Sequence, residues 1–388
     1  MVKLGKVRYC KKCVVPSSSA IPVEFDEEGN CSACSVSEQK FEVDWERREK
    51  MLGQLLEQYR SKDKTNYDCI IPVSGGKDSY YQIHVIKNVY GMNPLLVTYN
   101  SNNWTETGYR NLHNMRDVFG CDHIFFTPSI DLLKRMNRLC FRKMGDMNWH
   151  GHCGIYTVPF QISVKYNVPL LFYGEHGFMD LGGMHSYNDF IEHTARYRKE
   201  HTLRGYDWYD MLGDEIDPIE ENELLWAKFP SDEELKRVGV RGIFLGNYLQ
   251  WMPNEHTKLV IEKYGFEVSN EKFDRTYRSM SNLDDMHENG IHDYLKYIKF
   301  GYGRCTDHVC KDIRDGKMTR EEGIDLVKQY DHIKPRDLYR WLEYVNMTEE
   351  EFDRICDTFR DKRVWEQLPD RTWIKDNLWD EKETYERV

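Results

Sequence analysis

The stretch that most constrains the fold is a short apolar run that breaks into a glycine turn and continues as a helix. Residues 69–73 read Cys-Ile-Ile-Pro-Val, too few for a helix and bounded by turn-forming residues, so they predict a buried strand. Residues 74–76, Ser-Gly-Gly, predict the turn, and Lys77 begins a segment with helical spacing. Such a turn exposes backbone N–H groups in front of the positive end of the helix dipole. The sequence therefore predicts an anion site, most often used for phosphate.

The residues of this turn indicate a particular kind of phosphate loop. Only Ser74 separates Val73 from the paired glycines, so the Gly-x4-Gly-Lys-Ser/Thr pattern of kinases and GTPases does not apply. A Gly-Gly pair alone would be an ordinary tight turn, but Ser-Gly-Gly-Lys-Asp-Ser resembles the loop of PP-loop pyrophosphatases, which cleave ATP between its α and β phosphates. The residues expected to bind the nucleotide are Val73, Ser74, Gly75, Gly76, Lys77, Asp78 and Ser79.

Chain length and charge limit the classes of protein. The 388 residues suffice for two or three domains, and 54 basic against 65 acidic residues give a net charge of −11. That balance weighs against an extended nucleic-acid surface, although it permits a local basic pocket for a small anion. No apolar run is long enough to span a membrane and residues 1–12 lack a signal-peptide core, so we expect a cytoplasmic protein.

Four cysteines near the start of the chain have metal-ligand spacing. Cys10 and Cys13 form one Cys-x2-Cys pair and Cys31 and Cys34 form a second, with seventeen residues between the two pairs. Two such pairs can close tetrahedrally on one zinc ion, and residues 21–25 suit a short strand between them. Two disulfides are the alternative. Four thiolates leave no open coordination position, so a structural zinc knuckle or ribbon is predicted for residues 1–45.

Strands and helices alternate through the middle of the chain. A helix within residues 41–60 precedes a polar linker, which makes residues 46–66 a linker helix. Strands are then predicted at 69–73, 95–99, 123–127, 168–173 and 241–246, and helices at 107–119, 130–143 and 157–166. This alternation predicts a mostly parallel α/β sheet with helices on both faces over residues 67–265, with ligands at the carboxyl ends of the strands.

Three residues follow strands at that edge. Asn100 could bond adenine or ribose, and a turn-forming role is the alternative. Gly174 and Glu175 follow the 168–173 strand; Gly174 is expected to contact the nucleotide, and the carboxylate of Glu175 could hold a metal or a substrate N–H. Residues 177–240 interrupt the alternation and predict a lid or specificity insertion.

After residue 265 the chain is mostly helical, and residues 266–388 are predicted as a helical C-terminal region. Capping boxes at Ser231, Thr319 and Thr348, each with Glu three residues later, predict helix starts. Lys299 and Arg304 flank a Gly-Tyr-Gly segment and suit a phosphate or carboxylate clamp, with a solvated basic pair as the alternative.

Two candidate sites near residue 150 lack essential parts. His150, His152 and Cys153 fall below the usual ligand count for a second metal. The segment around Cys153 nearly matches the Gly-x-Cys-x-Gly elbow of glutamine-hydrolysing enzymes, but the final glycine and a matching His-x-Glu are missing. The sequence therefore shows no glutaminase of its own.

Taken together, these motifs resemble the N-acetyl sugar amidotransferases of the WbpG and PseA group, within the PP-loop (adenine nucleotide alpha hydrolase-like) superfamily. The resemblance rests on the cysteine knuckle, the phosphate loop, Gly174-Glu175 with Gly182-Gly183, the 299–304 segment and the helix start at Thr319. The resemblance implies an enzyme that converts an acetamido group of a sugar to an acetamidino group. The sugar is expected to be nucleotide-linked. The pathway would be the biosynthesis of O-antigen, another surface polysaccharide or a nonulosonic acid.

The resemblance also implies roles for residues. The amide oxygen would attack the ATP α-phosphate, and ammonia would displace AMP from the resulting imidate. The catalytic residues would be Lys77, Asp78, Glu175 and Lys299. Asp78 and Glu175 would hold Mg²⁺, and the substrate would be bound by Glu175, Lys299 and Arg304. Ammonia would come from a partner glutaminase with its cyclase-like companion.

The sequence leaves two other functional hypotheses open. PP-loop enzymes that modify tRNA, by thiolation or lysidine formation, also combine zinc knuckles with this loop, but they need a basic RNA face. The second hypothesis is that the protein is a zinc-ribbon adaptor whose nucleotide site regulates binding.

Overall fold

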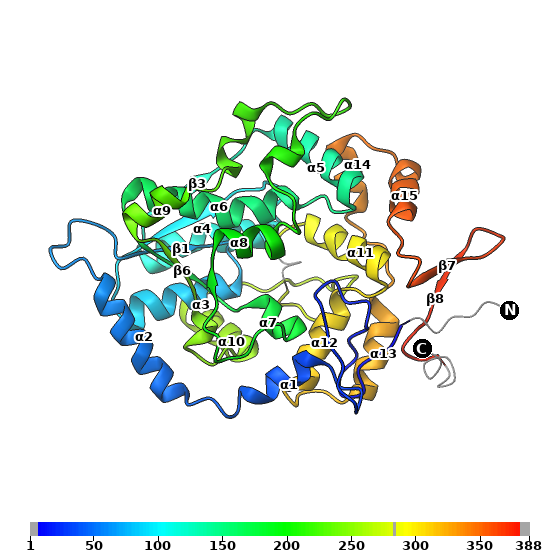
Figure 1. The fold of residues 1–388 in the computed structure, drawn as a ribbon, viewed down its shortest axis with the longest axis horizontal. Coiled ribbons are helices and arrows are strands. Elements are labelled where there is room, and N and C mark those ends of the chain that lie inside the picture. The colour runs from blue at the N-terminus through cyan, green and yellow to red at the C-terminus, as the bar shows by residue number, and fades with distance from the viewer. Residues whose placement is uncertain (1–6, 282–284, 381–388) are drawn as a thin grey trace.

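The computed structural model describes residues 7–281 and 285–380, and its centre is one six-stranded sheet (Figure 1). The strands are β1 (Cys69–Pro72), β2 (Pro94–Tyr99), β3 (His123–Phe126), β4 (Leu170–Tyr173), β5 (Glu192–His193) and β6 (Arg241–Phe244). Their order is β3-β2-β1-β4-β6-β5, and every neighbouring pair is parallel except β5 with β6. The predicted mostly parallel α/β fold is confirmed.

Side chains that alternate along the strands divide the core into two layers, one on each face of the sheet. In β1, Ile71 packs in one layer and Ile70 in the other. The first layer is covered by α2 (Trp45–Tyr59), α3 (Lys77–Ile83), α4 (Glu106–Phe119) and α10 (Pro253–Tyr264), and the second by α5 (Ile130–Met144) and α6 (Trp149–Tyr166). Because helices cover both faces, the central strands are almost wholly apolar.

The strand order reverses between β1 and β4. From β1 the chain proceeds to β2 and β3 on one side of the sheet, and it then crosses back to β4 and β6 on the other. In a parallel sheet, the loops after the two strands at such a reversal leave a crevice at the carboxyl edge. Those loops are residues 74–76 after β1 and 174–176 after β4. The topology thus brings together two predicted site segments that are about a hundred residues apart in the chain.

The predicted insertion, residues 177–240, contributes to the sheet and surrounds it. It contains α7 (Gly177–Gly182), β5, α8 (Ala195–Tyr197) and α9 (Asp232–Val238), with short 3-10 and π-helical turns between them. The predicted capping box of Ser231 and Glu234 opens α9. Because β5 pairs with β6, part of the insertion forms the outer edge of the sheet.

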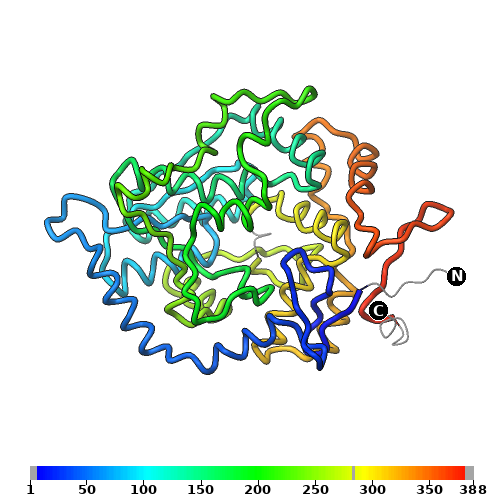
Figure 2. The backbone as a smooth tube through the Cα atoms, in the orientation of Figure 1, coloured from blue at the N-terminus to red at the C-terminus, as the bar shows by residue number. Residues whose placement is uncertain are grey.

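The C-terminal region folds against both the sheet domain and the start of the chain. It contains α11 (Glu288–Phe300), α12 (Arg304–Arg314), α13 (Arg320–Tyr330), α14 (Leu338–Val345), α15 (Glu349–Thr358) and a hairpin of β7 (Trp365–Gln367) and β8 (Trp373–Lys375). Helices α11, α14 and α15 share a core with α5, whereas α12 and α13 pack against the cysteine segment and its helix α1 (Ser32–Gln39). The start and end of the described chain lie on the same side of the molecule (Figure 2), where Tyr9 Oη donates to Asp376 O (3.0 Å). No helix in this described part of the protein is long and apolar enough to cross a membrane.

Two expectations about local structure are wrong. Residues 21–25 form no strand, since Phe25 makes only an isolated bridge with Cys31. Helix α6 begins at Trp149 rather than at residue 157. Its glycines look like turn residues in the sequence, but a Cβ at Gly154 would overlap the ring of Tyr99 in β2. Glycine is therefore used there for close packing of a helix on a strand.

This packing predicts opposite effects for two glycine-to-alanine changes in helices. Gly154→Ala should destabilise the fold by about 2 kcal/mol or more, because the Tyr99 ring cannot move aside freely in the core. Gly53→Ala is the matched control, since its Cβ would meet only Tyr90 at 3.6 Å, and it should be neutral or stabilising by about 0.5–1 kcal/mol. Urea unfolding of both variants tests this. Equal midpoints would contradict the tight contact at Gly154.

Candidate active site and metal centre

Two serines and a left-handed glycine give the loop after β1 its shape. Ser74 N–H donates to Ser79 Oγ (3.0 Å), and Gly76 N–H donates to Ser74 Oγ (3.3 Å). Gly75 has φ +84°, and a Cβ there would press on the backbone of Leu112 at 3.0 Å, so glycine is required. Helix α3 then starts directly. Ser79 N–H bonds to the Gly76 carbonyl (3.0 Å), whereas the N–H groups of Lys77 and Asp78, at the very start of the helix, are placed to receive an anion.

Lys77 and Asp78 form an ion pair at the start of α3, with 2.6 Å between Nζ and Oδ2. Burial lowers the pKa of Lys77, but Asp78 and Glu175 outweigh it and hold that pKa above its usual value. Burial also opposes ionisation of Asp78, yet the Lys77 ammonium brings the pKa of that carboxyl below its usual range. Asp78 Oδ1 is buried and meets no donor among the described residues. One carboxylate oxygen is therefore available to a cation.

Glu175, directly after β4, shares an ammonium group with Asp180 of α7. Lys311 Nζ of α12 lies 3.0 Å from Glu175 Oε1 and 2.6 Å from Asp180 Oδ2. Burial raises the pKa of Glu175, and Lys311 offsets this only in part. For Asp180, burial acts in the same direction, but Lys311 outweighs it and lowers the pKa. The electrostatic influence of Lys77 reaches Glu175, so both predicted loops and α12 meet in one charged cluster.

The carboxylate of Asp285 lies against the phosphate loop. A Cβ at Gly76 would lie 3.0 Å from Asp285 Oδ2, and a Cβ at Gly108 of α4 would overlap the Asp285 backbone. Thr105 N–H donates to Asp285 O (3.0 Å). Two glycines thus permit this segment to cross close to the loop. A carboxylate beside a phosphate site favours a divalent cation between the two groups.

The side chain of Asn100 makes hydrogen bonds around its own loop. Its Oδ1 accepts hydrogen bonds from Trp104 Nε1 (2.7 Å) and Asn102 N–H (3.0 Å), and its Nδ2 donates to Thr127 Oγ1 (3.1 Å). These bonds match the turn-forming alternative. Contact with adenine or ribose stays a prediction.

Gly174 allows the end of β4 to approach its neighbours. A Cβ there would lie 2.9 Å from Gln82 Nε2 of α3 and 3.0 Å from the ring of Trp251. Its carbonyl accepts a hydrogen bond from Gly246 N–H (3.1 Å) after β6. The glycine therefore sets the position of Glu175 relative to α3.

Lys299 belongs to a different group of charges from Lys77. Its Nζ lies 3.5 Å from Met144 O. Burial lowers the pKa of Lys299 to about 8, and Asp146 partly opposes this. Asp146 also accepts from His292 Nδ1 (3.0 Å) and pairs with Arg204. The structure thus places Lys299 with Asp146, which sequence spacing did not suggest.

Arg304 lies nearer to the predicted site. It pairs with Asp293 (2.8 Å), and the charge of Glu175 contributes to holding the pKa of Arg304 above its usual value against burial. The Gly-Tyr-Gly segment between Lys299 and Arg304 has a structural role. Tyr302 Oη accepts from Ala20 N–H (3.0 Å), which ties the C-terminal region to the cysteine segment.

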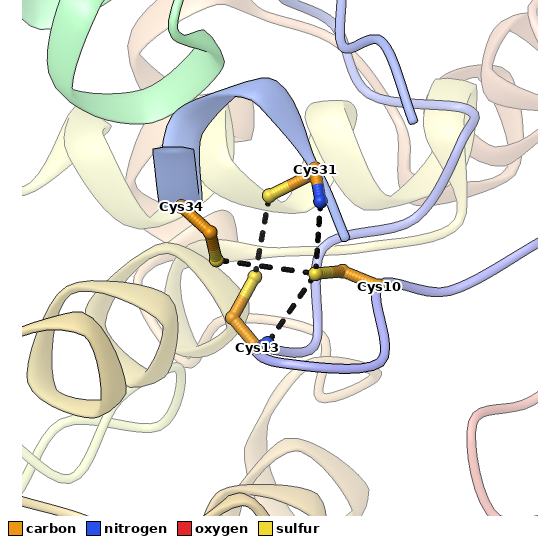
Figure 3. A group of neighbouring side chains, drawn as sticks. All are labelled: Cys10, Cys13, Cys31 and Cys34. Atoms are coloured by element: carbon orange, nitrogen blue, oxygen red, sulfur yellow. Dashed lines mark hydrogen bonds between the residues drawn. The ribbon is translucent and has the colours of Figure 1, made fainter. Parts of the chain in front are cut away.

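The four predicted metal ligands meet at one point (Figure 3). The Sγ atoms of Cys10, Cys13, Cys31 and Cys34 all lie within 4.8 Å of one another, with 3.9 Å between Cys10 and Cys34 and 3.7 Å between Cys13 and Cys31. All four cysteines are buried. The cluster can hold a metal ion. Among residues 7–281 and 285–380 it is the single group of three or more potential ligands that converge in this way.

An arginine from the C-terminal helix α12 contacts the cysteine cluster. Arg314 of α12 donates to Cys13 Sγ (3.5 Å) and Cys31 Sγ (3.6 Å), and also to Asp180 O (2.8 Å). A guanidinium beside several thiolates offsets part of their negative charge. A Cβ at Gly183 would overlap the backbone of Ser32, so the Gly182-Gly183 pair lets α7 pack directly on the knuckle.

The region around His150 provides no second metal site in the described chain. His150 is fully buried, 3.3 Å from Tyr99 Oη and 3.1 Å from Asn137 Nδ2. Cys153 is buried inside α6, and burial raises the pKa of its thiol. This supports the interpretation that Cys153 is no glutaminase nucleophile.

Sequence reasoning missed Lys311, Asp180 and Asp285. Each lies in a different part of the chain from the phosphate loop, and none belongs to a motif with recognisable spacing. The sequence offered little indication that Lys311 belongs to the site, because a lysine in a predicted helix is most often exposed to solvent.

The fold and site define an α/β protein with a PP-type phosphate loop and a tetracysteine knuckle. Residues 262–378 match the family described as LPS biosynthesis protein WbpG-like, C-terminal domain. The predicted resemblance to the WbpG group is thereby confirmed over these residues, which are similar to that C-terminal domain.

One solved structure aligns over most of the chain. It is the U34-tRNA thiolase NcsA from Methanococcus maripaludis with its [4Fe-4S] cluster, at 13% identity, 87% coverage of this chain, 96% coverage of its own and a TM-score of 0.30. No curated protein matches the chain.

The cysteine cluster predicts one metal ion per chain. Cys34→Ala should lose the metal, because three thiolates bind a tetrahedral ion far less tightly than four. Cys140→Ala, also buried but remote from the cluster, should retain it. Metal analysis of both purified variants by inductively coupled plasma mass spectrometry tests this. Equal metal content in the two variants would refute the site.

The Lys311 ammonium predicts a pH-dependent loss of stability in Lys311→Met. Without it, the folded-state pKa values of Glu175 and Asp180 rise, so folding becomes less favourable as pH increases through the range between the unfolded and folded values. The deficit relative to the natural chain should be small near pH 3, where both carboxyls are protonated in the unfolded chain, and should reach about 2 kcal/mol at pH 8 after allowance for the partial exposure of the cluster.

Urea unfolding at several pH values measures this deficit. Lys334→Met is the matched control, because Lys334 also pairs with two carboxylates, Glu349 and Asp353, but at the surface, so its loss should cost at most about 1 kcal/mol, with little dependence on pH. A pH-independent deficit in Lys311→Met would contradict the assigned charges.

Proposed function

We propose that the protein is an ATP-dependent amidotransferase that converts an acetamido group of a sugar to an acetamidino group in lipopolysaccharide biosynthesis. One observation carries the proposal: helix α12 of the WbpG-like C-terminal domain contributes Lys311 to Glu175 beside the phosphate loop. The region associated with this family therefore completes the same site as the nucleotide loop.

The loop supports cleavage of ATP between its α and β phosphates. The α3 N-terminus and Lys77 would stabilise the charge that develops on pyrophosphate. Asp78 fits a magnesium site because its Oδ1 is buried without a donor, and Asp285 and Glu175 are the carboxylates that could join it. Magnesium would neutralise phosphate charge there.

The amide carbon requires activation because an amide oxygen is a poor leaving group. The oxygen would attack the ATP α-phosphate, forming an O-adenylyl imidate, while the amide proton leaves with pyrophosphate. Ammonia would then form the new C–N bond, and AMP would depart with the electron pair of the C–O bond. Arg304 is the cation suited to bind the anionic part of the sugar substrate.

The knuckle suits a single zinc ion. Four sulfurs around zinc at a Zn–S distance of about 2.3 Å form a tetrahedron with edges of about 3.8 Å. The observed separations of 3.9 and 3.7 Å match that edge. A [4Fe–4S] cluster holds each of its four cysteines on a separate iron atom, which requires more widely spaced sulfurs. The ion would be structural.

Ammonia would come from another protein. Cys153 is buried and the chain shows no other glutaminase motif, so a partner glutaminase with its cyclase-like companion is the proposed source. Ammonium salts at high concentration should replace it.

The decisive experiment supplies the purified chain with ATP, ammonium chloride and a panel of acetamido sugars, free and linked to nucleoside diphosphates. We expect AMP and pyrophosphate rather than ADP and phosphate, and a product with the mass expected for exchange of O for NH. Lys77→Met should reduce AMP formation by about 100-fold or more, since it removes a charge at the cleaved bond.

Lys87→Met is the matched control for Lys77→Met. This lysine lies later in the same helical segment, where its Nζ contacts Gly120 O, so the variant should keep full activity. Release of ADP, or AMP formation that requires tRNA instead of a sugar, would overturn the proposed function.

A further inference from the structure

Helix α12 carries a histidine between two cations of the candidate site. Arg304, His308 and Lys311 follow one another at spacings of four and three residues, so they lie on one face of the helix. Lys311 Nζ lies 3.0 Å from Glu175 Oε1, and the charge of Glu175 also acts on Arg304. His308 therefore lies on the face of α12 that is turned toward the loop after β4.

Burial and four surrounding cations keep the pKa of His308 well below its usual value, so its ring is neutral. In decreasing order of effect these cations are Arg278, Arg304, Lys311 and Lys77. Their carboxylate partners are, in the same order, Asp312, Asp293, Glu175 with Asp180, and Asp78. Because Lys77 belongs to the phosphate loop and Lys311 to the cluster at Glu175, the imidazole lies near both parts of the site.

A buried threonine determines which ring nitrogen of His308 carries the hydrogen. Thr276 Oγ1 lies 2.6 Å from His308 Nδ1, and it also accepts a hydrogen bond from Arg278 N–H (3.3 Å). In the described part of the chain, Nδ1 is the one acceptor available to the threonine hydroxyl. A buried hydroxyl that donated to nothing would cost free energy, so Thr276 donates to Nδ1 and the ring hydrogen is on Nε2.

The nitrogen that carries this hydrogen is available to a ligand. Nε2 of His308 makes no hydrogen bond within residues 7–281 and 285–380, and unlike Nε2 of His176 it is not sealed from solvent. The residue as a whole is 7% exposed. Polar groups in such positions normally have a partner, so an N–H without one is suited to a bound molecule.

We propose that His308 is a further catalytic residue of the adenylation step, in which its Nε2–H donates a hydrogen bond to an oxygen of the departing pyrophosphate. The inference rests on the proposed function and adds a residue to its first half-reaction. In that step the amide oxygen forms a bond to the α-phosphorus, and the bond to the bridging oxygen breaks with its electron pair going to pyrophosphate. Negative charge grows on the leaving group, where an N–H donor stabilises it.

A neutral imidazole suits this role better than another cation or a base. The site already contains four cations, and an uncharged donor adds a hydrogen bond without adding charge. Because Nε2 carries the ring hydrogen, it has no lone pair with which to accept the amide proton. His308 therefore transfers no proton, and the balance of the reaction is unchanged.

Two substitutions of similar size separate a hydrogen-bond donor from a structural role. His308→Gln places an amide N–H near the position of Nε2, His308→Met has no donor, and both remove the nitrogen that bonds Thr276. The kcat of sugar-dependent exchange of pyrophosphate into ATP should fall about 100-fold in His308→Met and less than about tenfold in His308→Gln. KM for ATP should change by less than about threefold in both, because the bond strengthens in the transition state.

His332→Met is the control, because His332 is exposed after the end of α13 and its loss should leave exchange unchanged. The natural chain and His308→Gln should also have pH profiles of the same shape, since neither side chain titrates. Equal loss of exchange in His308→Gln and His308→Met would refute the donor and leave the proposed function intact. Absence of exchange in the natural chain with every sugar would refute the proposed function and the role of His308 with it.

A variant beside His308 keeps the test valid if those substitutions disturb folding. Thr276→Val keeps the shape of the side chain and removes the hydroxyl that places the ring hydrogen on Nε2. Exchange should fall about tenfold in the natural background and no further in the His308→Gln background, because the amide carries its N–H without the hydroxyl. Equal effects of Thr276→Val in the two backgrounds would overturn the proposal.

Discussion

The arrangement of the candidate site depends on one ammonium group, that of Lys311. It lies between two carboxylates from different parts of the chain, Glu175 at the rim of the sheet and Asp180 in the insertion. Without a cation, two such carboxylates in a confined space would repel each other and take up protons. Because the cation comes from α12, the C-terminal domain is a component of the site rather than an appendage to the sheet.

Helix α12 also links this site to the metal centre. One helical turn after Lys311, Arg314 donates to the sulfurs of Cys13 and Cys31 and to the Asp180 carbonyl. The cysteine segment has little core of its own, and it gains one by packing on α12 and α13. Its contacts with Tyr302 and Gly183 attach it to the C-terminal region and to the insertion. A metal ion that holds the four cysteines would therefore also hold α12 in position.

Local patterns were sufficient to predict several elements. The strand, glycine turn and helix around Lys77 are determined by residues adjacent in sequence, and Gly75 has the positive φ that the turn requires. The four cysteines were predictable for the same reason, because metal-ligand spacing is a local property. The start of α6 was predicted wrongly, since Gly154 looks like a turn residue until Tyr99 is seen beside it. Lys299 was assigned to the phosphate site, where its role stays a prediction, but it lies with Asp146.

The sequence by itself determined the alternation of strands and helices, the phosphate loop and the cysteine ligands. Each of these depends on side-chain periodicity, glycine conformation or ligand spacing within about thirty residues of chain. Only the tertiary structure decided which residues surround Glu175, because strand order and the docking of α12 bring together Lys77, Asp180 and Lys311. The physical reason is that charge pairing and burial act through space. No local pattern in the sequence records which distant side chain will lie opposite a carboxylate.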